Sequence, residues 1–223
     1  MGISIDTPGP VLPAGLAEWV ADSLRSGRNV LAFDSQGTLL LYREGGHEFV
    51  VKTAMGKPLV RRARQATLKR EYRAYQRMQG LAGVPRCLGM VAGRHLVLEA
   101  VHGQPYREAE IVDRENFFAE LLAILRAFHA RGVAHGDLKK KSNLMVTADG
   151  HPCVLDFGAT VLYREGFHPL NHWMFAYARQ LDLNAWVKHK YHGRYEDACG
   201  EDRELLDYSF IESWLRRRRQ RKA

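Results

Sequence analysis

Five short apolar segments, separated by turn residues, constrain the fold of this chain more than any other feature of its sequence. They are Asn29–Phe33, Thr38–Tyr42, Glu48–Thr53, Cys87–Val91 and His95–Ala100. A helical pattern without Gly or Pro over residues 59–79 interrupts them, and a short helix is expected before them over residues 14–26. The pattern predicts an α+β chain that begins with a five-stranded antiparallel sheet carrying one helix.

Helical patterns dominate the rest of the chain. Residues 116–131 carry a stripe of Phe and Leu that ends at Gly132, and Trp173, Tyr177 and Leu181 share one helical face. A further amphipathic pattern places Leu205, Tyr208, Ile211, Trp214 and Leu215 together. We therefore predict two lobes, residues 1–101 and residues 102–223, with a crevice near residues 99–103.

The composition, and the lack of a recognisable targeting signal in the sequence, predict a globular protein of the cytoplasm. With 223 residues and 46% hydrophobic residues, the chain can form a core without disulfides or a structural metal. Its three cysteines are Cys87, Cys153 and Cys199, and their wide spacing predicts free thiols in a reducing compartment. No secretory signal begins the chain, and no run of eighteen apolar residues occurs.

Positive charge is concentrated in two places. The net charge is +8, yet residues 57–77 alone carry eight basic residues against Glu71, and residues 216–222 add six more. Such patches indicate anionic partners, and the tail predicts peripheral attachment to the anionic inner face of a membrane. RNA binding is the rival explanation of the same charges. Few aromatic residues accompany the arginines, so the sequence favours the membrane over nucleic acid.

Four motifs occur in a defined order. His135-Gly136-Asp137-Leu138-Lys139-Lys140-Lys141-Ser142-Asn143 precedes an apolar run, and Asp156-Phe157-Gly158 begins thirteen residues after Asn143. Upstream, Val50-Val51-Lys52 lies within the predicted strand Glu48–Thr53. Glu71 follows Lys52 by nineteen residues and lies in the next predicted helix. Together they resemble the catalytic loop, the D-F-G motif, the third-strand lysine and the helix-C glutamate of the protein-kinase-like superfamily. The resemblance implies a two-lobed fold, with a five-stranded N-lobe and a reduced, mostly helical C-lobe.

The resemblance also implies roles in phosphoryl transfer. Asp137 would orient the acceptor hydroxyl and accept its proton, and Lys139 would point at the γ-phosphate. Asn143 and Asp156 would hold magnesium between the phosphate oxygens of ATP. The loop between Asp137 and Asn143 is one residue longer than in the family, which leaves Ser142 as an alternative metal ligand.

Nucleotide contacts follow from the same resemblance. Lys52 would contact the α- and β-phosphates while Glu71 holds it in place. Glu99 and Val101 would offer backbone groups to adenine, with Met145 beneath the ring. No G-x-G-x-x-G motif precedes the lysine, so only the turn Asp34-Ser35-Gln36-Gly37, ending in Gly37, is available to cover the phosphates.

The small size, the H-G-D loop and the short C-terminal lobe are similar to those of lipopolysaccharide-core (heptose or Kdo) kinases and of RIO-type kinases. The resemblance implies an ATP- and Mg²⁺-dependent kinase that phosphorylates a hydroxyl of a lipopolysaccharide core sugar, an anionic glycolipid, at the inner face of the inner membrane. A RIO-like serine/threonine kinase with a protein substrate is one alternative. A non-catalytic pseudokinase that serves as a binding module is another.

Overall fold

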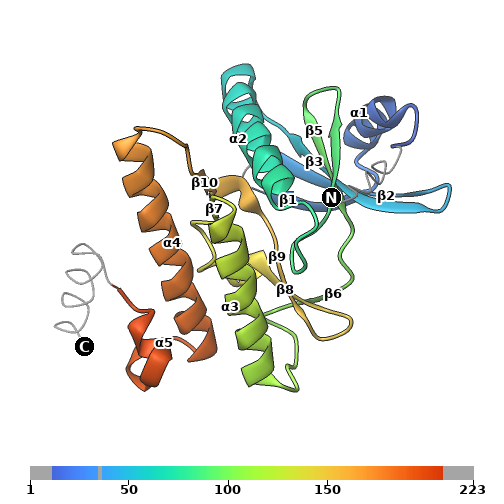
Figure 1. Ribbon diagram of the computed structural model, residues 1–223. Coiled ribbons are helices and arrows are strands. Elements are labelled where there is room, and N and C mark those ends of the chain that lie inside the picture. Colours follow the sequence, from blue (N-terminus) through green and yellow to red (C-terminus); the bar gives the residue numbers. More distant parts are fainter. Residues whose placement is uncertain (1–11, 35–36, 208–223) are drawn as a thin grey trace, which may run out of the picture. The chain divides into compact units, whose positions relative to one another are not determined.

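A computed structural model describes residues 12–34 and 37–207 of the chain (Figure 1). These residues form two compact units. Unit 1 contains the described residues up to Gly80, together with Val84–His102 and Asp156–Gly158. Unit 2 contains Leu81–Gly83, Gly103–Leu155 and the described residues from Ala159 onwards. Asp156–Gly158 thus lie with unit 1 although the segments on both sides of them lie with unit 2.

Unit 1 is built on the predicted five-stranded sheet. Its strands are β1 (Val30–Asp34), β2 (Gly37–Glu44), β3 (His47–Ala54), β4 (Cys87–Val91) and β5 (His95–Glu99). Every neighbouring pair is antiparallel, in the order β1-β2-β3-β5-β4. Each strand coincides with one apolar segment of the sequence, so the predicted α+β class and antiparallel sheet are confirmed.

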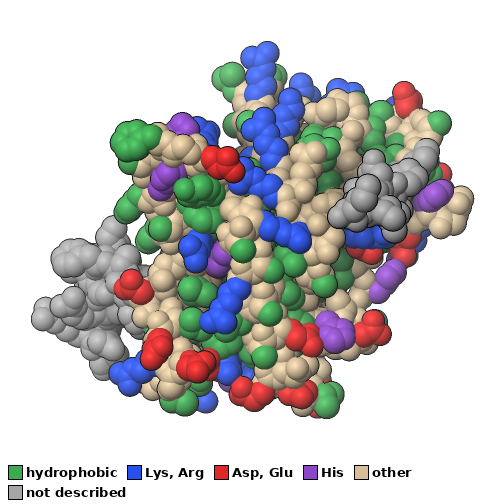
Figure 2. Space-filling view, in the orientation of Figure 1, with side chains coloured by type: hydrophobic (Ala, Val, Ile, Leu, Met, Phe, Trp, Pro, Cys, Tyr) green, Lys and Arg blue, Asp and Glu red, His purple; other side chains and the backbone are tan. Residues whose placement is uncertain are grey.

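Two helices accompany this sheet and create its core. From α1 (Leu16–Ser26), Leu16 and Val20 pack against apolar side chains of β2 and β3. The second helix, α2 (Pro58–Arg77), buries Leu68, Glu71, Ala74 and Tyr75. Its Lys and Arg side chains are mostly exposed, and Figure 2 shows them along the helix. The side of α2 that carries Glu71 is therefore the buried side.

Unit 2 is mainly helical, with α3 (Arg114–Ala130), α4 (Pro169–Lys190) and α5 (Gly200–Glu204). Asp113 caps α3 by accepting a hydrogen bond from the backbone N–H of Asn116 at 3.0 Å. The predicted Phe and Leu stripe of α3 is buried. α3 and α4 pack side by side (Figure 1), and the indole N–H of Trp186 donates to the carbonyl of Phe118 at 2.8 Å.

Five short strands in unit 2 escape the sequence-based prediction, which expected mostly helix. They are β6 (Gly103–Pro105), β7 (Val133–Ala134), β8 (Leu144–Thr147), β9 (Pro152–Val154) and β10 (Val161–Leu162). Runs of two to four residues are too short to show the period-two alternation of a strand. Their position matters, because β7 ends just before His135, β8 begins just after Asn143 and β9 ends shortly before Asp156.

The apolar face predicted for α4 is not the face that the helix buries. Trp173, Tyr177 and Leu181 lie in α4 as predicted, but Trp173 is 63% exposed, and the buried side of the helix carries Phe175, Ala178 and Trp186 instead. The last predicted helical pattern begins after α5 has ended at Glu204. Its residues from Tyr208 onwards, together with the basic tail, lie outside the described residues.

The cysteines, the helices and the two units can each be compared with the sequence-based expectations. The cysteines all lie among the described residues and are free thiols, as predicted. None of the helices within residues 12–207 is both long and apolar enough to span a bilayer. The antiparallel sheet with α2, and the helical character of unit 2, are compatible with the N-lobe and the helical lobe of a protein-kinase-like fold.

Candidate active site

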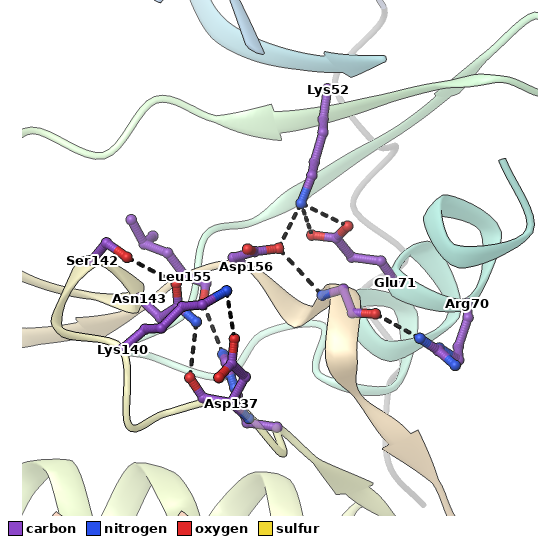
Figure 3. A network of polar contacts seen from close by, with 11 residues as sticks. Lys52, Arg70, Glu71, Asp137, Lys140, Ser142, Asn143, Leu155 and Asp156 are labelled. Carbon is purple, nitrogen blue, oxygen red and sulfur yellow. Dashed lines mark hydrogen bonds and ion pairs between the residues drawn. The ribbon is translucent and has the colours of Figure 1, made fainter. Parts of the chain in front are cut away.

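Lys52 is the centre of a buried charge cluster in unit 1. It extends from β3 with a side chain only 6% exposed, and its Nζ lies 3.0 Å from Glu71 Oε2 and 2.6 Å from Asp156 Oδ1 (Figure 3). Burial alone would lower the pKa of Lys52, but the two carboxylates outweigh that effect and raise the pKa above its ordinary value. The lysine is therefore a fixed cation at neutral pH.

Glu71 is the one acidic residue of the basic helix α2, and it is paired with Lys52 on the buried side of the helix. The residue is fully buried on α2, where an unpaired carboxylate would be strongly unfavourable. Lys52, nineteen residues earlier, donates a hydrogen bond to Glu71 Oε1 at 3.1 Å and supplies the compensating charge. The structure thus brings together the lysine and the glutamate that the sequence motifs paired.

The Asp156-Phe157-Gly158 segment is anchored in unit 1 at each of its residues. Phe157 is fully buried with its ring edge-on to Tyr75 of α2, at a centroid distance of 5.2 Å. The carbonyl of Gly158 accepts a hydrogen bond from Arg70 at 2.6 Å. Asp156 adopts φ 60°, in the left-handed region that few non-glycine residues occupy, and such outliers gather at functional sites.

The predicted adenine-contacting residues lie at the end of β5 and just after it. The N–H of Glu99 donates to the carbonyl of Arg86 at 2.9 Å, and the Glu99 carboxylate accepts from the Arg86 N–H at 3.0 Å. Val101 is half-buried in the irregular chain that follows. The backbone N–H of Glu99 is therefore already bound to the carbonyl of Arg86.

The structure requires a glycine at position 37 for a reason that does not involve a ligand. Gly37 pairs with Ala54 in the β2–β3 ladder, and a Cβ at this position would lie 1.9 Å from the carbonyl oxygen of Thr53. The close approach of β3 alone requires glycine. Ser35 and Gln36, the middle of the turn predicted to cover the phosphates, lie outside the described residues.

In unit 2, His135 shapes the loop that carries Asp137. The imidazole is fully buried, with Nε2 donating to the carbonyl of Leu155 at 2.8 Å and Nδ1 accepting from the backbone N–H of Asp137 at 3.2 Å. Gly136 adopts φ 77°, and a Cβ there would meet the carbonyl oxygen of Ala159 at 3.1 Å. The positive φ and this close approach explain why glycine stands before Asp137.

The extended loop after Asp137 folds back on that residue. Lys140 Nζ lies 2.8 Å from the Asp137 carboxylate, and the Asn143 side-chain amide donates to the Asp137 carbonyl at 3.0 Å (Figure 3). Asn143 is 3% exposed. Ser142 is exposed, and its hydroxyl lies 3.4 Å from Asn143 Oδ1. Despite the extra residue, the asparagine remains tied to the aspartate, with its Oδ1 beside the Ser142 hydroxyl.

Two predicted residues of unit 2 remain, Lys139 within this loop and Met145 just after it in β8. Lys139 is half-buried, and its carbonyl accepts a hydrogen bond from Lys188 at 3.4 Å. Met145 is half-buried in β8, paired with Pro105 of β6 and Cys153 of β9. A cavity of about 490 Å³ in the same unit, between β6, the β8–β9 turn and the start of α3, contains none of the predicted site residues.

Asp182 is a functional candidate that sequence reasoning missed. This fully buried residue of α4 accepts hydrogen bonds from the backbone N–H groups of His135 and Gly136, each at 2.8 Å, and lies 2.9 Å from His129 Nε2. Asp182 therefore fixes the start of the loop that runs from His135 to Asn143. A carboxylate between Ala178 and Ala185, on the buried side of the helix, was the available signal.

His189, seven residues further along α4, supports the same loop at Leu138, just after Asp137. Its Nε2 donates to the carbonyl of Leu138 at 2.8 Å, and the side chain is buried. Burial lowers the pKa of His189 to about 4, and the positive charges of Lys188, Lys141 and Arg114 act in the same direction. The imidazole is therefore neutral at pH 7 and acts as a hydrogen-bond donor to the backbone.

Comparison with known proteins gives partial matches to protein kinases. No family model matches the chain. A probable serine/threonine-protein kinase of Dictyostelium discoideum is 42% identical over 62 residues, which cover 28% of this chain and 14% of that protein. Calcium-dependent protein kinase 14 of Oryza sativa subsp. japonica is 25% identical over 146 residues, covering 58% of this chain and 27% of the kinase.

A third match has the same character. Calcium-dependent protein kinase 29 of Arabidopsis thaliana is 26% identical over 136 residues, covering 56% of this chain and 26% of the kinase. The chain thus spans between 14% and 27% of the length of these curated relatives. The finer resemblance to lipopolysaccharide-core and RIO-type kinases stays a prediction. The matches and the α+β fold together support a place for this chain in the protein-kinase-like superfamily.

Proposed function

We propose that this chain is an ATP- and Mg²⁺-dependent phosphotransferase that phosphorylates a hydroxyl of a lipopolysaccharide core sugar. The contacts of Lys52 with Glu71 and Asp156 are the observation that carries the phosphotransferase part of the proposal. A cation fixed by two carboxylates is suited to bind nucleotide phosphates, and the similarity to protein kinases supports the same chemistry.

The residues present fit a nucleotide and a magnesium ion. Lys52 would hold the α- and β-phosphates, and Asp156 and Asn143 would provide hard oxygen ligands of the kind that Mg²⁺ prefers. A magnesium ion at such a site would take its other ligands from phosphates and water. When bound, the ion supplies charge neutralisation on the phosphates.

Asp137 would perform the proton transfer. The acceptor oxygen forms a bond to the γ-phosphorus while the bond from that phosphorus to the bridging oxygen of ADP breaks. The acceptor proton passes to the Asp137 carboxylate, and ADP leaves with the electron pair of the broken bond. Asp182, His135 and His189 would act as positioning residues, since they hold the backbone that carries Asp137.

The lysine run beside Asp137 supports an anionic acceptor. Lys140 already contacts the Asp137 carboxylate, and Lys141 is exposed one residue further on. Three successive cations next to the proposed base favour a hydroxyl with a negative group nearby, because opposite charges attract and orient the incoming molecule. A sugar acid or a sugar phosphate of the lipopolysaccharide core has this chemistry.

A RIO-like serine/threonine kinase activity is the second candidate. It is favoured by the similarity to proteins named as serine/threonine and calcium-dependent protein kinases. The two candidates share the nucleotide and metal residues and differ only in the acceptor, so one labelling experiment separates them.

The experiment incubates purified protein with Mg²⁺ and ATP labelled at the γ-phosphate in a Gram-negative membrane-plus-cytosol extract, and then separates glycolipid from protein. Asp156→Asn provides the control, because it keeps the shape of the side chain and removes its charge. Label in glycolipid that the control loses would support the core-sugar kinase. Label in Ser or Thr would support the protein kinase, and nucleotide binding without transfer would support a non-catalytic module.

A further inference from the structure

The first half of α4 and the residue before its cap expose a group of large apolar side chains, which we call the α4 patch. The exposed fractions are 92% for Phe167, 69% for Leu170, 63% for Trp173, 43% for Met174 and 39% for Tyr177. The rings of Trp173 and Tyr177 are stacked, with a centroid distance of 5.8 Å. Figure 2 shows hydrophobic side chains gathered at this end of α4.

The α4 patch is a stripe rather than a scatter of single residues. Leu170, Trp173, Met174 and Tyr177 follow one another at steps of three, one and three, which places them on one side of the helix. The core of unit 2 uses other residues of α4, such as Phe175 and Trp186. A solvated outer face would carry charged residues instead, so a contiguous apolar stripe indicates a surface that binds something.

The composition of the α4 patch is that of a lipid-binding surface. Trp and Tyr are enriched where a protein meets the headgroup region of a bilayer, and exposed Phe, Leu and Met can enter the acyl boundary beneath it. Arg164 precedes the segment and is followed by Glu165, whereas Arg179 lies on the opposite side of α4 from the α4 patch, over the ring of Phe175. The segment also contains two histidines, and the chain ends with six basic residues among the seven from 216 to 222.

We propose that the α4 patch inserts into the headgroup region of an anionic lipid bilayer. Apolar insertion and positive charge elsewhere on the chain reinforce each other in such binding. The inference draws its biological meaning from the proposed function, because a kinase of a membrane-embedded glycolipid must work at the surface that holds its acceptor. Its physical basis is independent of that function, since neither Lys52 nor Asp137 contributes to it.

The test measures co-sedimentation of the full chain with vesicles, in the absence of nucleotide and glycolipid. Vesicles of phosphatidylcholine alone are compared with vesicles that also contain phosphatidylglycerol. Leu170→Glu is the test variant. Val112→Glu is the matched control, because Val112 is fully exposed in the same unit, outside the α4 patch, and receives the same charge. We expect binding to the anionic vesicles to fall about tenfold or more for Leu170→Glu and to persist for Val112→Glu.

Tryptophan fluorescence gives a second reading that does not depend on a charged variant. Comparison of the wild type with Trp173→Phe isolates the emission of Trp173 from that of the three other tryptophans. This emission should shift to shorter wavelength when anionic vesicles are added, because the indole leaves water. A shifted emission before vesicles are added would mean that another part of the protein or a second copy covers the α4 patch, and would overturn the proposal.

Two further outcomes would also overturn it. One is equal vesicle binding by wild type and Leu170→Glu. The other is a wild type whose mass in light scattering is that of a dimer and which does not bind vesicles. That result would assign the α4 patch to contact with a second copy of the chain. Because the vesicle assay contains neither ATP nor an acceptor, a negative result there leaves the proposed kinase standing. Failure of phosphate transfer in the labelling experiment likewise leaves the vesicle result untouched.

Discussion

Burial of His189 makes the free energy of unfolding depend on pH, and the size of the effect follows from the structure. The imidazole is 2% exposed, and its pKa is lowered from an ordinary 6.5 to about 4. Between these two values the unfolded chain binds a proton that the folded protein does not. The slope of the unfolding free energy with pH is therefore positive, and stability falls as pH drops from 6.5 towards 4.

The magnitude follows from the same two pKa values. At pH 5 the unfolded histidine is almost fully protonated and the folded one is almost fully neutral, whereas at pH 7 both are mostly neutral. One unit of pKa corresponds to about 1.4 kcal/mol. His189 should therefore remove about 2 kcal/mol of stability between pH 7 and pH 5. Burial also lowers the pKa of His95 to about 4, so the wild type should lose more than the share of His189.

The assay is urea denaturation of the wild type and His189→Gln at pH 7 and pH 5. Glutamine does not titrate, and its Nε2 can still donate to the Leu138 carbonyl. The variant should lose about 2 kcal/mol less than the wild type over this interval, and the loss from His95 should remain. His168→Gln, at an exposed position just before α4, serves as the control and should behave as the wild type does. Parallel pH slopes for the wild type and His189→Gln would refute the reasoning.

Three further substitutions test the site itself. Asp137→Ala should lower turnover by roughly 10² to 10⁴ and leave nucleotide affinity nearly unchanged, because it removes a positioned base; unchanged turnover in a steady-state assay would contradict the mechanism. Glu71→Gln should lower the free energy of unfolding by about 1–3 kcal/mol, because Lys52 keeps only Asp156 as a charged partner. If urea denaturation gave Glu71→Gln the same free energy of unfolding as the wild type, the charge cluster would not contribute to stability. Asp182→Ala should cost about 3 kcal/mol or more, because two backbone N–H groups of the catalytic loop lose their acceptor, and hydrogen exchange at the N–H groups of His135 and Gly136 should rise with it.

Local pattern was sufficient to predict part of the fold and part of the site. The sheet strands of unit 1 could be found because each is an apolar run bounded by turn residues, and α2 because the nineteen residues after its first position lack Gly and Pro. Lys52, Glu71 and Asp156 could be grouped because their motifs keep a recognisable order along the chain. Their mutual contacts fit that grouping.

Other features depend on contacts between distant segments and leave little local signal. Asp182 and His189 act on a loop more than forty residues earlier, and only the folded chain brings them to it. The two sides of α4 are both rich in apolar residues, so periodicity alone could not tell that Phe175 faces the core while Trp173 faces water. Gly37 was assigned to phosphate binding, although the approach of Thr53 already requires a glycine there.

The placement of Asp156–Gly158 in unit 1 has a consequence for how the protein is made. A ribosome must add Asp156 before Lys52 can meet its second carboxylate, and Phe157 before that ring can pack against Tyr75. A nascent chain that ends at residue 102 therefore lacks the second carboxylate of the charge cluster. Completion of unit 1 waits until the catalytic loop has also emerged, so this unit cannot mature before much of unit 2 has been translated.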